Sequence, residues 1–187
     1  MDTEKVENMW YQLLLELGED PERTGLKDTP KRIAKMYREV FRGYYEEPPT
    51  ITSFDDESPR GLITDKGYFF SMCEHHAVPF FGYYYFGYIP DPNGYYLGAS
   101  KIGRAVDYFS ARLQTQEKLI RNILDHIEAS IHPLGCILLM TGRHLCKEMR
   151  GLKKWDSPFE VIEARGILLQ NKDGCKDEFM ARLGSRI

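Results

Sequence analysis

The chain has 187 residues, of which 42% are hydrophobic and 28% charged, and these values are ordinary for a soluble globular protein with one main domain. A formal net charge of −3 gives no general electrostatic case for binding nucleic acid or a membrane, so any basic site must be a local cluster. We expect a cytoplasmic protein, because the sequence has no apolar run near the roughly 18 residues of a membrane span, no secretory leader and no disulfide framework.

The first 50 residues are predicted to form a helical segment. Apolar residues from Val6 to Leu17 recur at helical spacing and give one apolar stripe, which ends at a Gly-Glu-Asp-Pro sequence. A second helix is predicted to begin with Thr29 as its N-cap and Pro30 at the first helical position, where a missing N–H costs nothing. Two amphipathic helices therefore precede the rest of the chain.

A linker is predicted between residues 48 and 60. The pair Pro48-Pro49 and the acidic run Asp55-Asp56-Glu57 interrupt the periodic pattern there. This boundary divides the chain into the helical segment, residues 1–50, and a larger domain, residues 51–187.

The larger domain shows strand-like spacing, then helical spacing, then strand-like spacing again. The strand-like runs are rich in aromatic and β-branched residues and are bounded by Pro and Gly. They cover Tyr68–Met72, Gly82–Ile89, Cys136–Met140 and Val161–Leu169, and Asp91-Pro92-Asn93-Gly94 predicts a turn. Two helices are predicted in the middle, after Gly98 and from Leu113 to Ile131. The sequence therefore predicts an α+β fold ordered strand pair, helix pair, strand pair.

Thiols and imidazoles occur at spacings that suit a metal ion. Cys73 and His76 are separated by two residues, so one turn can bring both to a single ion, and a strand pairing could add Cys146. Thiolate and imidazole together favour zinc, and three protein ligands leave the fourth tetrahedral position open, as in catalytic sites. Two alternatives remain: buried thiols with no ligand role, or a structural zinc site with His75 or His144 as its fourth ligand.

Two further histidines are candidates for proton transfer. In a strand, residues two apart face the same side, so we expect His144 to point into the same space as Cys146. His75 is adjacent to His76 in the sequence, so we expect it to lie beside the predicted metal site. Both imidazoles are therefore predicted to act as acids or bases near the metal.

A cluster of cations is predicted at the start of a helix. Ser100 can cap this helix, and Lys101 and Arg104 fall in its first turn, where positive charge opposes the helix dipole. The arrangement becomes favourable if a phosphate binds there, although surface cations are more often simply solvated. Further charge for a polyphosphate could come from Arg32, Lys35 and Arg150.

Gln116 and Glu117 offer an amide and a carboxylate near the start of the next predicted helix. A carboxylate that accepts two N–H groups is a natural partner for the edge of guanine. The alternative is that both are ordinary surface residues of a helix.

Several motifs occur in an order typical of one enzyme family. They are Ser71 to His76, Gly98 to Lys101, Arg112 to Glu117 and His144 to Cys146 followed by Met149-Arg150-Gly151, with Thr29 to Tyr37 before them. From about residue 6 to 152 the chain closely resembles GTP cyclohydrolase I. The resemblance implies a tunnelling fold for the catalytic domain, in which five subunits form a barrel and two rings form a toroidal homodecamer. It also implies hydrolysis of GTP to 7,8-dihydroneopterin triphosphate and formate, the first step toward tetrahydrofolate, biopterin or queuosine.

The resemblance further implies a role for each candidate residue. Zinc would be held by Cys73, His76 and Cys146, and water made reactive by the metal would attack C8 of guanine. His144 would exchange protons at the purine, His75 would assist opening of the ribose ring, and Ser100 would lie near the ribose. The guanine edge would be held by Gln116 and Glu117, and the triphosphate by Lys101, Arg104, Arg150, Arg32 and Lys35. The family forms this site between neighbouring subunits.

The sequence departs from the family pattern at two places. After Arg150-Gly151 the family usually continues with a Ser/Thr-rich strand, whereas residues 153–166 here read KKWDSPFEVIEARG. Ala99 replaces the usual Leu before Ser-Lys. The alternatives are therefore a divergent member that releases a partly processed product, or a nucleotide-binding module with structural zinc. A nitrile reductase of the same fold fits poorly, because it needs no zinc and uses other residues.

Overall fold

A computed structural model describes residues 1–54, 61–92 and 94–184. It divides into two compact units, Met1–Glu47 and Pro48–Ile187, each of which is described by itself. The acidic run Asp55-Asp56-Glu57 and Asn93 of the predicted turn lie outside the described residues. Among the residues that are described, no helix combines the length and apolar character needed to cross a membrane.

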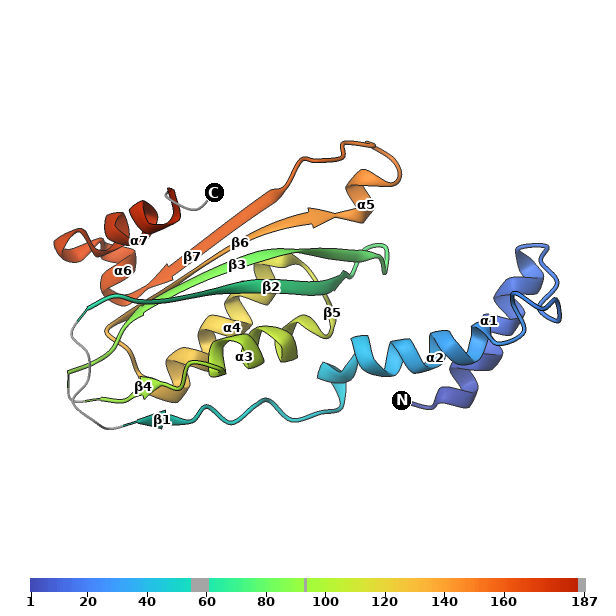
Figure 1. Ribbon diagram of the computed structural model, residues 1–187, viewed down its shortest axis with the longest axis horizontal. Coiled ribbons are helices and arrows are strands. Elements are labelled where there is room, and N and C mark those ends of the chain that lie inside the picture. Colours follow the sequence, from blue (N-terminus) through green and yellow to red (C-terminus); the bar gives the residue numbers. More distant parts are fainter. Residues whose placement is uncertain (55–60, 93, 185–187) are drawn as a thin grey trace. The chain divides into compact units, whose positions relative to one another are not determined.

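The N-terminal unit consists of two helices that pack on each other. They are α1 (Thr3–Glu16) and α2 (Thr29–Val40), and the short 3-10 helix η1 (Arg42–Tyr44) follows (Figure 1). The rings of Trp10 and Tyr37 meet edge-on, with centroids 6.2 Å apart. The prediction that Thr29 is the N-cap is wrong by one residue, because Asp28 holds that position and Thr29 is already helical. Pro30 is therefore the second helical residue and not the first as predicted, although it still lies in the first turn.

The second unit is built on a five-stranded sheet with the order β5-β2-β3-β6-β7. Its long antiparallel strands are β2 (Ile63–Cys73), β3 (Pro79–Ile89), β6 (Gly135–His144) and β7 (Phe159–Arg165), and the short β5 (Leu113–Gln114) runs parallel to the end of β2. A separate two-stranded sheet joins β1 (Ser53–Phe54) to β4 (Tyr96–Leu97).

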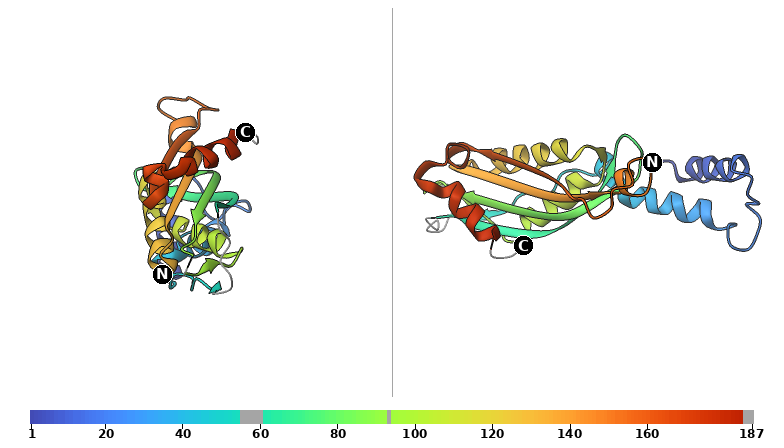
Figure 2. Two further views of the ribbon diagram at one scale, coloured as in Figure 1. Left: turned by 90° about the vertical axis from the view of Figure 1, so that its left-hand side faces the viewer. Right: turned by 90° about the horizontal axis from the view of Figure 1, so that it is seen from above.

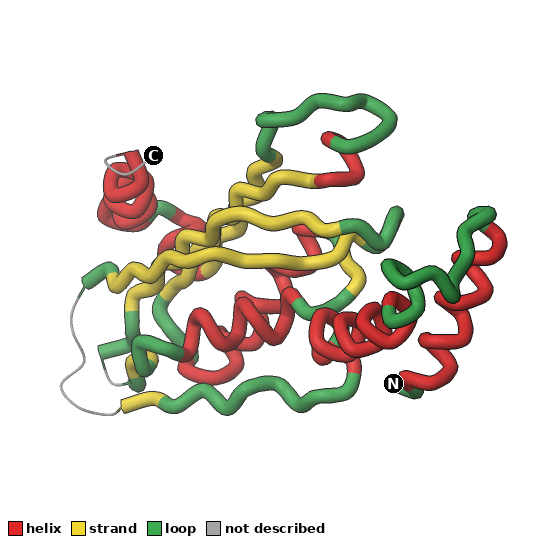
Figure 3. The backbone as a smooth tube through the Cα atoms, turned by 45° about the vertical axis from the view of Figure 1, so that its right-hand side comes forward, coloured by secondary structure: helices red, strands yellow, loops and turns green. Residues whose placement is uncertain are grey.

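Helices cover both faces of the large sheet. On one face lie α3 (Lys101–Ser110) and α4 (Gln116–Ile131), and α6 (Gly166–Gln170) and α7 (Cys175–Gly184) lie on the other (Figures 1 and 2). The short elements α5 (Leu145–Glu148) and η2 (Lys172–Gly174) complete this unit. Figure 3 shows the long loop that joins α5 to β7.

The core follows the two-residue period of β6. Leu138 and Met140 pack among the buried residues beneath α3 and α4, whereas Ile137 and Leu139 pack toward α6 and α7. Strand β6 is therefore buried on both faces over most of its length. Its C-terminal end leads directly into α5.

The predicted order of strand pair, helix pair and strand pair is present as β2–β3, α3–α4 and β6–β7. The predicted strand Val161–Leu169 is wrong at its end, because the strand stops at Arg165 and α6 begins at Gly166. Gly166 has a φ of +57°, and a Cβ there would collide with the backbone of Leu134. The chain turns sharply at this glycine instead of continuing as a strand.

Candidate metal centre

Cys73, His76 and Cys146 converge at one edge of the sheet. One donor atom from each side chain lies within 4.8 Å of the other two. Strands β2 and β6 both run antiparallel to β3, so their C-terminal ends meet at the same edge. Cys73 is the last residue of β2, and Cys146 lies in α5 directly after β6. The topology thus joins ligands that are far apart in the sequence.

The turn after β2 is fixed by backbone hydrogen bonds. The N–H of Cys73 donates to the carbonyl of Val78 at 2.9 Å, and the N–H of Ala77 donates to the carbonyl of Cys73 at 2.8 Å. The N–H of Glu74 donates to the carbonyl of Gln114 at 3.3 Å and ties the turn to β5. This closed turn brings His76 back toward Cys73.

The donor set fits zinc. Two thiols and one imidazole are the ligand types that zinc prefers, and three of them leave one tetrahedral position open. Burial and the neighbouring Cys73 thiol raise the pKa of Cys146, and a cation bound beside this thiol would favour its thiolate form. Within the described parts of the chain, no other group of three His, Cys, Asp or Glu side chains brings its donor atoms this close.

His75 lies beside the converging trio without belonging to it. Its Nδ1 is 3.8 Å from the Sγ of Cys73, and its ring centroid is 6.4 Å from that of His76. The side chain is exposed. It is therefore free to meet a molecule that approaches the centre.

His144 is held in a partly buried aromatic slot. Its ring stacks on Phe80 with centroids 4.7 Å apart and an interplanar angle of 8°, and it meets Phe159 edge-on at 5.7 Å. Burial lowers its pKa. The expectation that His144 and Cys146 share a strand face is wrong, because β6 ends at His144 and Cys146 is helical. His144 is still only two residues from a predicted ligand.

Gln116 was expected either at the edge of guanine or on the helix surface, but its side chain is buried. Its side chain is 1% exposed, and its amide contacts the carbonyls of Met140 and Phe159 and the ring of His144. With all three contacts made inside the protein, this amide does not present itself to a purine edge. Glu117, by contrast, is exposed in the first turn of α4, where the helix dipole favours a carboxylate.

The residues predicted to bind phosphate lie at the start of α3, after α5 and on α2. Ser100 is the N-cap of α3 but makes no capping hydrogen bond, and the first turn that follows contains Lys101 and Arg104 and no acidic residue. A cavity of about 300 Å³ lies at the start of this helix and is lined in part by Gly98 and Ala99. Arg150 is exposed after α5, and Arg32 and Lys35 are exposed on α2 of the N-terminal unit.

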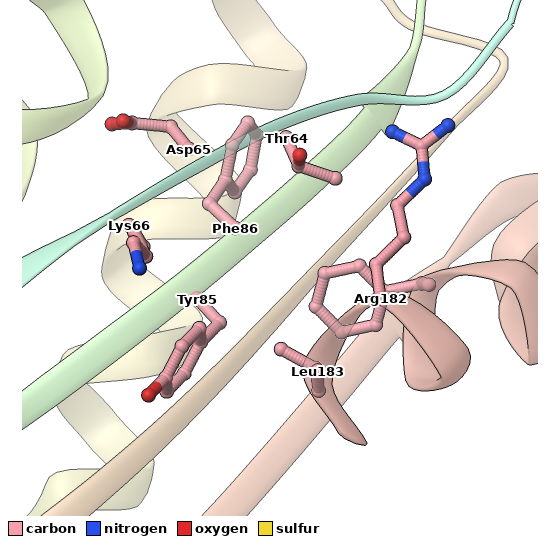
Figure 4. A pocket seen from close by; sticks show the side chains of 8 residues that line it. Thr64, Asp65, Lys66, Tyr85, Phe86, Arg182 and Leu183 are labelled. Atoms are coloured by element: carbon pink, nitrogen blue, oxygen red, sulfur yellow. The ribbon is translucent and has the colours of Figure 1, made fainter. Parts of the chain in front are cut away.

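A smaller cavity, of about 130 Å³, lies between α7 and strands β2 and β3 (Figure 4). It is lined by Thr64, Asp65 and Lys66, at the end of β2 opposite to Cys73. Arg182 on its rim donates to the carbonyl of Leu62 and pairs with Glu178. This cavity is therefore separate from the candidate metal centre.

Comparisons of the sequence with a family model and with curated relatives indicate one family. The model of the GTP cyclohydrolase I family matches residues 6–184, beyond the limit at 152 found by sequence resemblance. A GTP cyclohydrolase 1 from Streptococcus mutans is 42% identical over 174 residues, covering 92% of this chain and 90% of the relative. The enzyme of the same name from Streptococcus pyogenes is 40% identical over 183 residues, covering 97% of this chain and 93% of the relative. The one from Streptomyces coelicolor is 41% identical over 169 residues, covering 89% of this chain and 84% of the relative. Among solved structures, the apo archaeosine synthase QueF-Like matches with a TM-score of 0.48 and 18% identity, covering 58% of this chain and 96% of that one.

Proposed function

The chain belongs to the GTP cyclohydrolase I family, and from this premise we propose that it hydrolyses GTP to 7,8-dihydroneopterin triphosphate and formate with a zinc ion held by Cys73, His76 and Cys146. The observation that carries the proposal is the convergence of these three donor side chains within 4.8 Å of one another. It occurs inside a family match that spans nearly the whole chain.

The metal centre is proposed to be catalytic and not structural. When bound, zinc would supply Lewis-acid chemistry, which makes water a usable nucleophile near neutral pH. The chain contributes three ligands, and neither His75 nor His144 is in the group of donor atoms that lie within 4.8 Å. That arrangement supports an open coordination position over a closed four-ligand site.

The two remaining histidines are proposed to move protons. The ring of His144, held between Phe80 and Phe159, would give a proton to the purine nitrogen that leaves C8 as formate is released. His75, exposed beside Cys73, would assist opening of the ribose ring, with Ser100 near the sugar. Both act on the substrate and leave the metal ligands unchanged.

Substrate recognition is proposed to divide between base and phosphate. Glu117 would accept N–H groups of guanine. The N-terminus of α3, which has no side-chain cap, would receive phosphate with its two cations. Arg150, Arg32 and Lys35 would add charge around the triphosphate. The complete pocket would form between subunits of a decamer of two pentamers, so that one chain does not need to contain it.

Substitutions should separate these two kinds of recognition. Glu117→Gln replaces an anionic acceptor with a partial donor, so the KM for GTP should rise about 10- to 100-fold, while ATP competes as it does against the unmodified protein. Lys101→Ala and Arg104→Ala should weaken GTP and ATP alike, and more strongly at low salt. The measurement is the KM for GTP together with the inhibition constant of ATP for each variant.

Lys172→Ala is the matched control, because Lys172 is exposed in η2 and belongs to none of the proposed sites. It should leave both constants unchanged. Equal losses of GTP and ATP affinity in all three site variants would contradict the division of roles.

The activity itself is tested with GTP labelled with ¹³C at C8. Zinc-loaded protein should transfer the label to free formate, which NMR detects directly, and ATP labelled at the same carbon should give none. Consumption of GTP without labelled formate, or no consumption at all, would contradict the proposed function.

A further inference from the structure

The amide of Gln116 is oriented by the two strands beside it. Its Nε2 donates to the carbonyl of Met140 on β6 at 2.8 Å and to the carbonyl of Phe159 on β7 at 3.1 Å. A side-chain amide has two N–H groups, and both are used by these carbonyls. Rotating the amide by 180° would set its oxygen against two carbonyl oxygens. The hydrogen-bond network therefore fixes which end of the amide is which.

That orientation determines the role of one nitrogen of His144. The Oε1 of Gln116 lies 2.9 Å from the Nε2 of His144, and an amide oxygen can only accept. Nε2 of His144 must therefore carry a hydrogen and donate it to Gln116. Nδ1 is left as the ring nitrogen that can exchange a proton with a substrate.

A glycine provides the space for this contact. Gly142 lies on β6 two residues before His144, and a Cβ built there would be 2.5 Å from the Oε1 of Gln116 and 3.2 Å from Cζ of Phe69. The Gln116 side chain is 1% exposed and Phe69 is also buried, so neither can move aside freely. Any side chain at position 142 would push the amide oxygen away from His144.

We infer that Gln116 is a positioning residue that holds the imidazole of His144 with Nδ1 presented to the substrate, and that Gly142 is required for the same contact. The inference rests on the proposed function, in which His144 gives a proton to the purine. In that step Nδ1 first takes a proton from the water that attacks the purine and then gives it to the leaving purine nitrogen. The N–H bond at Nδ1 breaks, an N–H bond forms on the purine nitrogen, and the electron pair stays on Nδ1. Nε2 keeps its hydrogen bond to Gln116 throughout. The amide therefore acts on the reaction through His144 and not by holding guanine.

The test separates positioning from substrate binding. Gln116→Met keeps the side-chain length but removes both donors and the acceptor, and Gly142→Ala displaces the amide without changing its chemistry. Each should lower kcat for formate release about 10- to 100-fold, with the KM for GTP changed less than about threefold. Zinc content per chain and GTP affinity measured by calorimetry on metal-free protein should match those of the unmodified protein.

Two controls and a double substitution complete the design. Gln170→Met makes the same chemical change at an exposed position, and Gly184→Ala adds a Cβ where nothing lies within 4 Å, so both should keep full activity. In a His144→Ala background, Gln116→Met should lower the residual rate by less than about twofold, because residues that act through one another are not additive.

Three results would overturn the inference. A raised KM with unchanged kcat in Gln116→Met would return the residue to guanine binding. A full additional loss in the His144→Ala background would show that it does not act through His144. Unchanged kcat in Gly142→Ala, which stands as the test if Gln116→Met does not fold, would remove the amide contact from the reaction. Absence of formate from the unmodified protein would instead reject the proposed function.

Discussion

Replacing any one of Cys73, His76 and Cys146 with alanine should remove zinc and lower formate release by at least about 10³-fold. The reason is that the metal stabilises the transition state by several kcal/mol. The oligomer should remain largely intact, since the sheet and the helices α3 and α4 supply a core that does not depend on the ion. Zinc per chain is measured by elemental analysis, activity by labelled formate, and assembly by size-exclusion chromatography.

Two substitutions outside the centre are the matched controls for this result. Cys175→Ser keeps a donor for the carbonyl of Ile167, to which the Cys175 thiol donates at 3.3 Å, and His132→Asn keeps a residue that tolerates a φ of 45°. Both should retain zinc and turnover. If any of the three ligand variants keeps stoichiometric zinc and full activity, that residue does not bind the metal.

His144→Ala should retain zinc yet lower formate release by about 10²- to 10⁴-fold, the contribution expected from a positioned proton donor. His144→Phe should behave in the same way while restoring the stacking on Phe80 and the edge contact with Phe159, so that lost packing is not the cause. His75→Ala should still open the imidazole ring of guanine but stall afterwards and accumulate a formylated or ring-opened nucleotide. The measurements are zinc content, labelled formate and chromatography of the nucleotide products.

Loss of zinc from the His144 variants would contradict this assignment. It would make His144 a fourth ligand and favour a closed structural site over a catalytic one. Full formate release from His144→Ala with zinc retained would show instead that another group supplies the proton.

Much of the fold was predictable because its signals are local. The aromatic runs at Tyr68–Met72 and Gly82–Ile89 lie within β2 and β3, and the apolar residues from Leu113 to Ile131 lie mostly on α4. The strand end at Gly166 was missed because nothing nearby in the sequence shows that the backbone of Leu134 blocks a side chain there. Short strands such as β5 were missed because two residues carry no periodic signal.

The candidate site likewise contains residues that local sequence signals identify and residues whose environment depends on distant parts of the chain. Cys73 and His76 could be paired from their spacing, and Cys146 was added through an expected strand pairing and the resemblance. The helical turn at α5 that places Cys146 has no clear local pattern. The environment of Gln116 depends on carbonyls of Met140 and Phe159, which lie 24 and 43 residues away in the chain. Any residue type can supply a backbone carbonyl. Only the packed arrangement of α4, β6 and β7 brings this amide to the ring of His144.

The reaction with ¹³C-labelled GTP, followed to completion and with both products counted, tests the central claim most directly. Zinc-loaded protein should give one formate and one 7,8-dihydroneopterin triphosphate for each GTP consumed, the pterin being measured by fluorescence after oxidation. Protein stripped of zinc should give neither, and adding zinc should restore both. Formate without an equal amount of pterin, or a ring-opened nucleotide as the final product, would contradict the account.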